Sequence, residues 1–398
     1  MTPRVADFST HFSGPFASRQ LSHLGADVIK VEHPDRGDGN QGAPPYVDGV
    51  GVHHLYLNSG ARSLAIDPQS PKWPGVVAAI TKWADVVIVG RRPATAARLG
   101  IDFASLLRHN ENLVYCLISG YGLDGEWANY PAHGLNMDAL AGAVPVEWDK
   151  DRPLPPRNYR STGTTLAGLH GAVGILAALH RRDRGLGAQF VHVSIWESAL
   201  SWQWRDLTTF ANTGEPWQQY RDLGSRYSMY RAADDGVILV CPIERHFWER
   251  FCDVVGLGAE ARSRGDWTNG EDFGTTDGGE QEEVQQRIAT RPRDEWVRLL
   301  AAADVPVAPV LEWPESMSSG HARANGLMTT YRYRERAVDV PTSPVSVTSA
   351  ADLADFELGS LSAAHREKGA SLSAAPEIGE HTEEVLKELG LEPLDDET

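Results

Sequence analysis

The sequence is poor in cysteine and in long apolar runs, and each shortage excludes a class of protein. Its three cysteines, Cys116, Cys241 and Cys252, share no CxxC spacing, so neither a disulfide framework nor a structural zinc site is expected. The segment after Met1 lacks the apolar core of a signal peptide, and no apolar run approaches about 18 residues. We therefore expect a cytoplasmic protein without a membrane span.

Positive charge is scarce as well. The chain has 37 Lys and Arg against 54 Asp and Glu, which gives a formal net charge of −17. A field of this sign repels nucleic acids and anionic lipid headgroups, so neither is an expected partner. At 398 residues the chain exceeds one ordinary core and suggests about two or three domains.

The regular elements alternate between strand and helix patterns. Such alternation predicts an α/β fold with a parallel, doubly wound sheet. A change of composition near residue 200 suggests a domain boundary, residues 263–283 read as a Gly-rich acidic loop, and a long irregular stretch is expected after Pro309. Strands are expected at 26–31, 84–89, 113–119, 189–195 and 237–241, and helices at 16–24, 76–83, 137–142, 163–182 and 382–389.

A GxGxxG run, Gly120 to Gly125, directly follows the predicted strand at 113–119. In a dinucleotide site this run leads into a helix whose first amides bind the pyrophosphate. Here Pro131 and the absence of a helical apolar pattern follow instead. We expect a plain glycine turn, with a nicotinamide or flavin nucleotide site as the alternative.

Arginines gather in two places although the chain as a whole is acidic: one follows Asn58-Ser-Gly-Ala, and the other follows the predicted strand at 84–89. Arg62 lies in one group, and Arg91, Arg92 and Arg98 lie in the other. The carboxyl ends of parallel strands are where doubly wound sheets hold phosphorylated ligands, although solvated surface arginines give the same pattern. A ligand that carries phosphate would depend on such local charges, because the overall field opposes it.

Histidines are scattered and indicate no metal site. His133 lies in a loop before the predicted helix at 137–142, where a lone histidine is more often a surface residue than a base. The pair His53 and His54 has no acidic partner nearby in the sequence, and no HExxH, Walker A or GxSxG motif is present. No metal is therefore expected.

Several blocks of the sequence resemble the class III CoA-transferases. Asp7 with the run Gly14-Pro-Phe-Ala-Ser-Arg19 is similar to the opening signature of that family, which also includes carnitine CoA-transferase, formyl-CoA transferase and α-methylacyl-CoA racemase. Further blocks follow in the family's order over most of the chain. They are residues 24–38, 58–67, 84–101, 112–122, 174–194 and 304–310.

The resemblance implies an architecture and a ligand. It implies a Rossmann-like large domain from residues 1–200 and 320–398, a smaller α+β domain from residues 225–312, and an interlocked dimer. The implied substrates are acyl-CoA and a small carboxylic acid, with coenzyme A held along the large domain. Arg98 stands at a position where family members contact CoA, and Arg92 and Arg62 are the further candidates for CoA binding.

The family's chemistry depends on an aspartate that this sequence lacks at the matching place. In the transferases that aspartate attacks the acyl-CoA thioester, and in the racemases a His and an Asp move the α-proton. Without gaps, the aspartate position reads Thr164, and no carboxylate or cysteine lies between Asp151 and Asp183. His133 matches the racemase histidine, but Gly134 replaces the aspartate that follows it.

Three hypotheses about activity remain open from the sequence. The chain is an active CoA-transferase, or an acyl-CoA racemase or isomerase, that uses His133 or a residue that the sequence does not identify. Alternatively, it is a catalytically silent subunit whose paralogous partner supplies the aspartate in a heterodimer. The third hypothesis, from a different class, is a protein that binds a nicotinamide nucleotide. A neighbouring gene product with Asp at the position of Thr164 would favour the silent subunit.

Overall fold

The computed structural model describes residues 2–215, 223–276, 278–347 and 373–394. The chain divides into two compact units. Met1–Trp204 and Gly320–Thr398 form the first unit, and Arg205–Ser319 form the second. The sequence analysis predicted the corresponding segments as 1–200 with 320–398, and 225–312.

A six-stranded sheet forms the centre of the first unit, and every neighbouring pair in it is parallel. The chain passes from β1 to β2 and β5 on one side, and then returns to β6, β7 and β10 on the other. The strand order therefore reverses at β1. In spatial order the strands are β10 (Gln189–Ser194), β7 (Val114–Ser119), β6 (Val86–Val89), β1 (Arg4–Asp7), β2 (Asp27–Glu32) and β5 (Ala61–Ala65).

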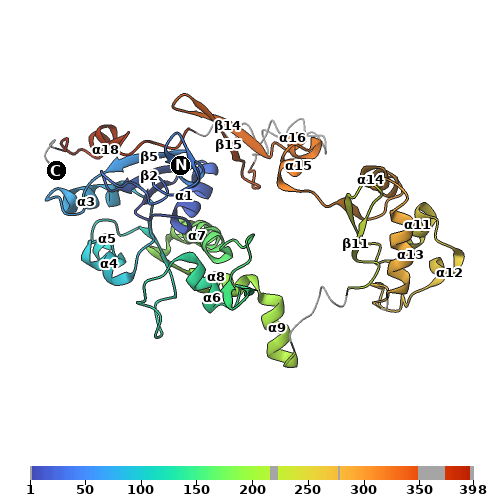
Figure 1. Ribbon diagram of the computed structural model, residues 1–398. Helices are drawn as coiled ribbons and strands as arrows, with labels where there is room; N and C mark the ends of the chain where they lie inside the picture. The colour runs from blue at the N-terminus through green and yellow to red at the C-terminus, as the bar shows by residue number, and fades with distance from the viewer. Residues whose placement is uncertain (1, 216–222, 277, 348–372, 395–398) are drawn as a thin grey trace. The chain divides into compact units, whose positions relative to one another are not determined.

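Helices cover both faces of this sheet (Figure 1). On one face lie α1 (Ser13–His23) and α7 (Thr162–Arg181). On the other lie α3 (Trp73–Trp83), α4 (Pro93–Arg98), α5 (Phe103–Leu107) and α18 (Thr382–Glu388). A strand buried on both faces reads as a continuous apolar run, as β6 does with Val-Val-Ile-Val. The predicted α/β fold with a parallel doubly wound sheet is confirmed.

The glycines of α7 let neighbouring segments approach the helix closely. A Cβ at Gly168 would lie 2.6 Å from the carbonyl oxygen of Ser13, and one at Gly174 would lie 2.6 Å from Val191. By length and composition, the segment Thr162–Leu186 could also cross a membrane, so the expectation that no stretch reaches that length is wrong. Half of it is buried against the sheet and α1, as in the core helix of a globular unit.

A β-hairpin occupies part of the stretch that was expected to be irregular. It consists of β14 (Met328–Tyr333) and β15 (Arg336–Pro341), which pair antiparallel. Tyr331 and Tyr333 alternate with exposed residues and pack against α2 (Val52–Leu57), so a period of two was present in the sequence. The expectation of an irregular stretch was wrong for these residues, and part of it, 348–372, lies outside the described residues.

The second unit is a small α+β unit with its own core. Strands β11 (Ser228–Arg231), β12 (Val237–Val240) and β13 (Val307–Pro309) form an antiparallel sheet, and α11 (Arg245–Val255), α13 (Gly279–Ile288) and α14 (Arg293–Ala302) pack on it. The predicted loop at 263–283 overlaps α12 (Ala259–Ser263) at its start and ends earlier than expected, because α13 begins at Gly279.

The remaining elements are short and connect these layers. They are β3 (Tyr46–Val47), β4 (Val50–Gly51), α6 (Gly134–Leu140), β8 (Glu147–Asp149), β9 (Arg152–Leu154), a π-helical turn at Arg182–Leu186, α8 (Ile195–Trp202), α9 (Trp204–Thr213), α15 (Trp313–Met317) and α16 (Gly320–Ala324).

A buried ion pair joins the carboxyl ends of β1 and β2. The ammonium nitrogen of Lys30 lies 3.3 Å from Asp7 and 2.9 Å from Asp38, and it donates to the carbonyl of Ser9 at 2.7 Å. All three ionised side chains are at most 2% exposed. Burial alone would lower the pKa of Lys30, but the two carboxylates outweigh it and hold the pKa above its ordinary value.

Replacing Lys30 by Met should destabilise the first unit by about 3–5 kcal/mol, because two carboxylates would stay buried without their cation. The measurement is the protection of β1 and β2 amides by hydrogen exchange across a urea series. The control is Arg332→Met, which breaks an exposed pair with Glu335 and should change the free energy of unfolding by about 1 kcal/mol or less. Equal effects of the two variants would contradict the prediction.

Candidate functional site

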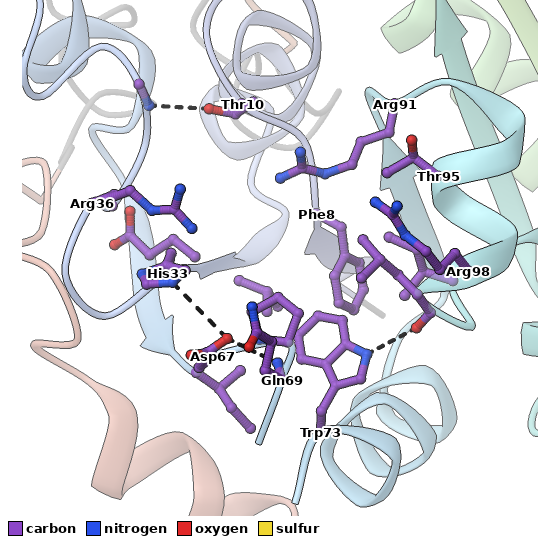
Figure 2. A pocket seen from close by; sticks show the side chains of 18 of the residues that line it. Phe8, Thr10, His33, Arg36, Asp67, Gln69, Trp73, Arg91, Thr95 and Arg98 are labelled. Carbon is purple, nitrogen blue, oxygen red and sulfur yellow. Dashed lines mark hydrogen bonds and ion pairs between the residues drawn. The ribbon is translucent and has the colours of Figure 1, made fainter. Parts of the chain in front are cut away.

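A cavity of about 630 Å³ opens at the carboxyl ends of four neighbouring strands. Its lining follows β1, β2, β5 and β6, which places it where the strand order reverses. Open α/β sheets bind their ligands at this point, because the loops there diverge and leave a crevice. The polar side chains around it include Thr10, His33, Arg36, Asp67, Arg91 and Arg98 (Figure 2).

Three arginines of the cavity form no ion pair with any described residue: Arg36, Arg91 and Arg98. They come from the loop after β2, the end of β6 and the end of α4, respectively. Uncompensated guanidinium groups that converge on one cavity favour an anion, and their planar donors suit phosphate oxygens.

The other two predicted CoA-binding arginines lie outside this lining. Arg62 is held by Asp27 at 2.7 Å, Glu384 at 3.0 Å and Glu388 at 2.6 Å, so its charge ties β5 to α18. Arg92 donates to the carbonyl of Asn129 at 3.2 Å. Only Arg98 of the three lines the cavity, while Arg91, noted in the sequence but not chosen, and Arg36 line it as well.

The floor of the cavity is apolar. Phe8 meets Trp73 edge to face with ring centroids 6.0 Å apart, and the indole N–H of Trp73 donates to the carbonyl of Leu99 at 2.8 Å. This bond fixes α3 against the end of α4. An apolar floor below a rim of arginines suits a ligand with an aromatic base and phosphate groups.

A carboxylate and a histidine form the remaining wall. His33 Nδ1 accepts from the backbone N–H of Asp35 at 3.2 Å, so the neutral ring carries its proton on Nε2. Nε2 lies 4.0 Å from Asp67 Oδ1. Gln69 adds an amide beside them (Figure 2). This wall accepts hydroxyl or amino donors and repels phosphate.

His11 lines the cavity in an unusual backbone conformation. Its φ of 69° lies in the left-handed region, which a non-glycine residue rarely adopts. Its N–H donates to Asp38 at 3.1 Å, and its ring fills the space above Gly39, where a Cβ would lie 2.5 Å from Nε2. No pattern in the sequence marks His11, because its place in the cavity depends on a contact with Gly39, 28 positions later, that only the fold creates.

The two residues predicted to stand in for the catalytic pair lie near each other, outside this lining. A Cβ at Gly134, next to His133, would lie 2.6 Å from the side chain of Thr164. His133 is exposed and begins α6, with its N–H donating to Asn136 at 2.9 Å. The hydroxyl of Thr164 is buried and donates to the carbonyl or hydroxyl of Ser161, at 3.1 and 3.2 Å.

A buried carboxylate that sequence analysis missed lies at the N-terminus of α7. Asp138, on α6, accepts from the backbone N–H groups of Thr162 and Gly163, both at 3.0 Å, and from the Tyr159 hydroxyl at 2.9 Å. Burial and this carboxylate raise the pKa of Tyr159 to about 12. Asp138 lies 24 positions before Thr162 in the chain, so no local sequence pattern predicts the hydrogen bond between them.

Position 163 has no room for a side chain. A Cβ at Gly163 would lie 2.5 Å from Asp138 Oδ1 and 2.8 Å from the carbonyl oxygen of Ile195.

Within the described residues, no group of three or more His, Cys, Asp or Glu side chains is placed to hold a metal ion. The glycine turn after β7 agrees with its prediction, because no helix begins before Gly134.

Comparison with known proteins gives a family. Residues 3–382 match the family model for CoA-transferase family III. The chain is 26% identical over 355 residues to acetyl-CoA:oxalate CoA-transferase of Acetobacter aceti, covering 86% of this chain and 88% of the relative. It is 27% identical over 398 residues to human alpha-methylacyl-CoA racemase, covering 97% and 92%.

A solved structure shows the same fold. The crystal structure of a CaiB/BaiF family protein from Brucella suis superposes with a TM-score of 0.75 at 20% identity. The alignment covers 97% of this chain and 98% of the other. The α/β architecture is therefore shared over nearly the whole length.

Replacing Gly163 by Ala should lower stability by about 1–3 kcal/mol, because the new methyl group meets a backbone carbonyl and a buried carboxylate. The matched control is Gly75→Ala in α3, where nothing lies within 4 Å of the new Cβ. That change should raise stability by up to about 1 kcal/mol. Thermal unfolding of both variants checks the opposite signs, and a stabilised Gly163 variant would contradict the packing described here.

Proposed function

The chain belongs to CoA-transferase family III, and on that premise we propose that it binds an acyl-CoA thioester in the cavity and takes part in CoA transfer between carboxylic acids. The observation that supports this most directly is the convergence of Arg36, Arg91 and Arg98, without carboxylate partners among the described residues, at the switch point of the sheet. The nucleotide end of CoA carries a pyrophosphate and a 3′-phosphate, and no metal is part of the proposal.

To bind CoA, the positive charge of the cavity arginines has to outweigh the negative field of the whole protein. A net charge of −17 repels a polyanion such as CoA at long range. Within a cavity the dielectric is lower than in water, so nearby guanidinium groups act more strongly on a phosphate than distant surface carboxylates do.

The relatives suggest which acids to try. They include an acetyl-CoA:oxalate, a succinyl-CoA:mesaconate and a formyl-CoA:oxalate CoA-transferase. Small dicarboxylic acids are therefore the first acceptor class that we propose for this chain.

The N-terminus of α7 favours a second candidate, a silent subunit. In the proposed chemistry a carboxylate attacks the thioester carbonyl, CoA thiolate leaves, and an enzyme-bound anhydride forms. Thr164 offers only a hydroxyl, and the partners within hydrogen-bond reach of it belong to Ser161 and are not bases. A paralogous partner that carries an aspartate would supply the missing group.

An apolar face of α7 supports a second chain in either case. Leu169, Val173 and Leu176 recur at helical spacing and are 42%, 59% and 43% exposed. We propose that a second copy or a paralogous subunit covers this face in an interlocked dimer.

The racemase alternative has weaker geometric support. Such a reaction needs one acid or base on each side of the α-carbon. His133 is exposed and available, but the nearby carboxylate of Asp138 is fully buried and accepts three hydrogen bonds. Exchange of the α-proton of a 2-methylacyl-CoA in heavy water, lost in His133→Ala, would support this alternative instead.

Replacing Arg98 by Ala should weaken CoA binding by about 10- to 150-fold, the loss of one charged hydrogen-bonding group. Isothermal titration calorimetry at fixed salt measures it. The matched control is Arg92→Ala, since Arg92 lies on the same segment but outside the cavity lining and should leave the affinity unchanged. An equal loss in both variants would place CoA elsewhere.

Replacing Thr164 by Asp should create or strongly increase CoA exchange between acetyl-CoA and oxalate or mesaconate, because it supplies a carboxylate at the N-terminus of α7. Mass spectrometry of the CoA thioesters follows the reaction. Thr165→Asp is the control, since it adds the same charge at an exposed neighbouring position.

The wild-type chain distinguishes the two candidates. Exchange by the pure wild-type homomer would exclude the silent subunit, and exchange only in Thr164→Asp would support it. Native mass spectrometry of the protein expressed with its genomic neighbours then identifies the partner, and a stable homomer with no second chain would count against the heterodimer.

A further inference from the structure

Arg36 and Arg91 reach toward the same space from two sides. Arg36 follows β2 and Arg91 follows β6, and β1 lies between these strands. Figure 2 shows their guanidinium groups pointing toward one another across the cavity. Two like charges directed at one point repel each other unless an anion lies between them.

The protein's own carboxylates do not neutralise this pair. Asp38 and Asp7 are the carboxylates that act on Arg91, but both are buried and bound to Lys30. The carboxylate of Glu32 also lines the cavity, where it is buried and accepts from the Ser63 hydroxyl. Partial desolvation by the walls of the cavity lowers the pKa of Arg91, the carboxylate of Asp38 opposes that shift, and the charge of Arg36 adds to it. Neither arginine forms an ion pair with any described residue.

The other wall of the cavity directs an anion to this pair. Asp67, 4.0 Å from His33, carries negative charge on that side, with Gln69 beside it. A phosphate placed there would meet a carboxylate. The hydroxyl and amino groups of a nucleotide would instead find acceptors.

We propose that Arg36 and Arg91 form a clamp that holds the 5′-pyrophosphate of CoA above the carboxyl end of β1. This inference rests on the proposed function, since it assigns one part of CoA to one part of the cavity. Two adjacent phosphates, each with a negative charge, match two converging guanidinium groups. In doubly wound sheets the pyrophosphate lies at the switch point, which here is β1.

The test compares CoA with 3′-dephospho-CoA, which keeps the pyrophosphate and lacks the 3′-phosphate. Calorimetry on the full chain gives the dissociation constants for wild type, Arg36→Ala, Arg91→Ala and the double variant. Each single variant should lose about 10- to 150-fold in affinity for both ligands alike. The double variant should lose less than the product of the single losses, because both arginines hold one group.

Two results would overturn the clamp. If the loss in Arg36→Ala or Arg91→Ala disappears with 3′-dephospho-CoA, that arginine holds the 3′-phosphate. If the single losses multiply in the double variant, the two arginines bind separate groups. Both side chains are exposed, so unchanged thermal midpoints should show that the variants fold.

Inorganic pyrophosphate separates failure of the clamp from failure of the proposed function. Phosphorus NMR should show that it binds wild type and not the double variant. A wild-type protein that binds pyrophosphate but not CoA would refute the proposed CoA binding, while showing that Arg36 and Arg91 still hold a pyrophosphate group. A wild-type protein that binds neither would refute both.

Discussion

The cavity depends on the interactions of one buried carboxylate, that of Asp38. One of its oxygens meets the ammonium of Lys30 at 2.9 Å, and the other accepts from the backbone N–H groups of His11 and Asn40 at 3.1 and 2.9 Å. A single buried group therefore joins β2, the loop after β1 and the loop after β2. These loops carry Arg36 and the left-handed His11 to the cavity. Because Lys30 also binds Asp7, this cation compensates both of the carboxylates that act on Arg91.

The position of the cavity follows from the topology of the sheet. Chain crossovers leave β1 toward β2 on one side and arrive at β6 on the other, so the loops after these strands diverge above β1. Of the strands, β2 contributes its last two residues, Val31 and Glu32, to the lining of the cavity. The segments that follow the strands supply the three arginines. An acidic protein can thus hold a local positive site, since the arginines converge there while most of the carboxylates lie elsewhere on the surface or in ion pairs.

The sequence predicted the layers of the fold better than the site. Apolar runs such as 84–89 and 113–119 are long enough to indicate buried strands, and β6 and β7 lie there. The central strand β1 has only four residues, Arg4–Asp7, and no such run marks it. The predicted grouping of arginines behind strands was informative, but Arg62 pairs with Glu384 and Glu388, more than 300 positions away. Neither that pairing nor the direction of Arg91 and Arg92 at the end of β6 can be obtained from local sequence.

The N-terminus of α7 receives its negative charge from another helix. Asp138 places a carboxylate against the first amides of the helix, where the helix dipole favours negative charge. That carboxylate is fully buried and saturated with donors, so it satisfies the helix end without being presented to a ligand. Thr164 and Ser161, one turn apart, meanwhile bond to each other. The polar groups of this region are thus satisfied by one another, which stabilises the packing of α6 against the first turn of α7.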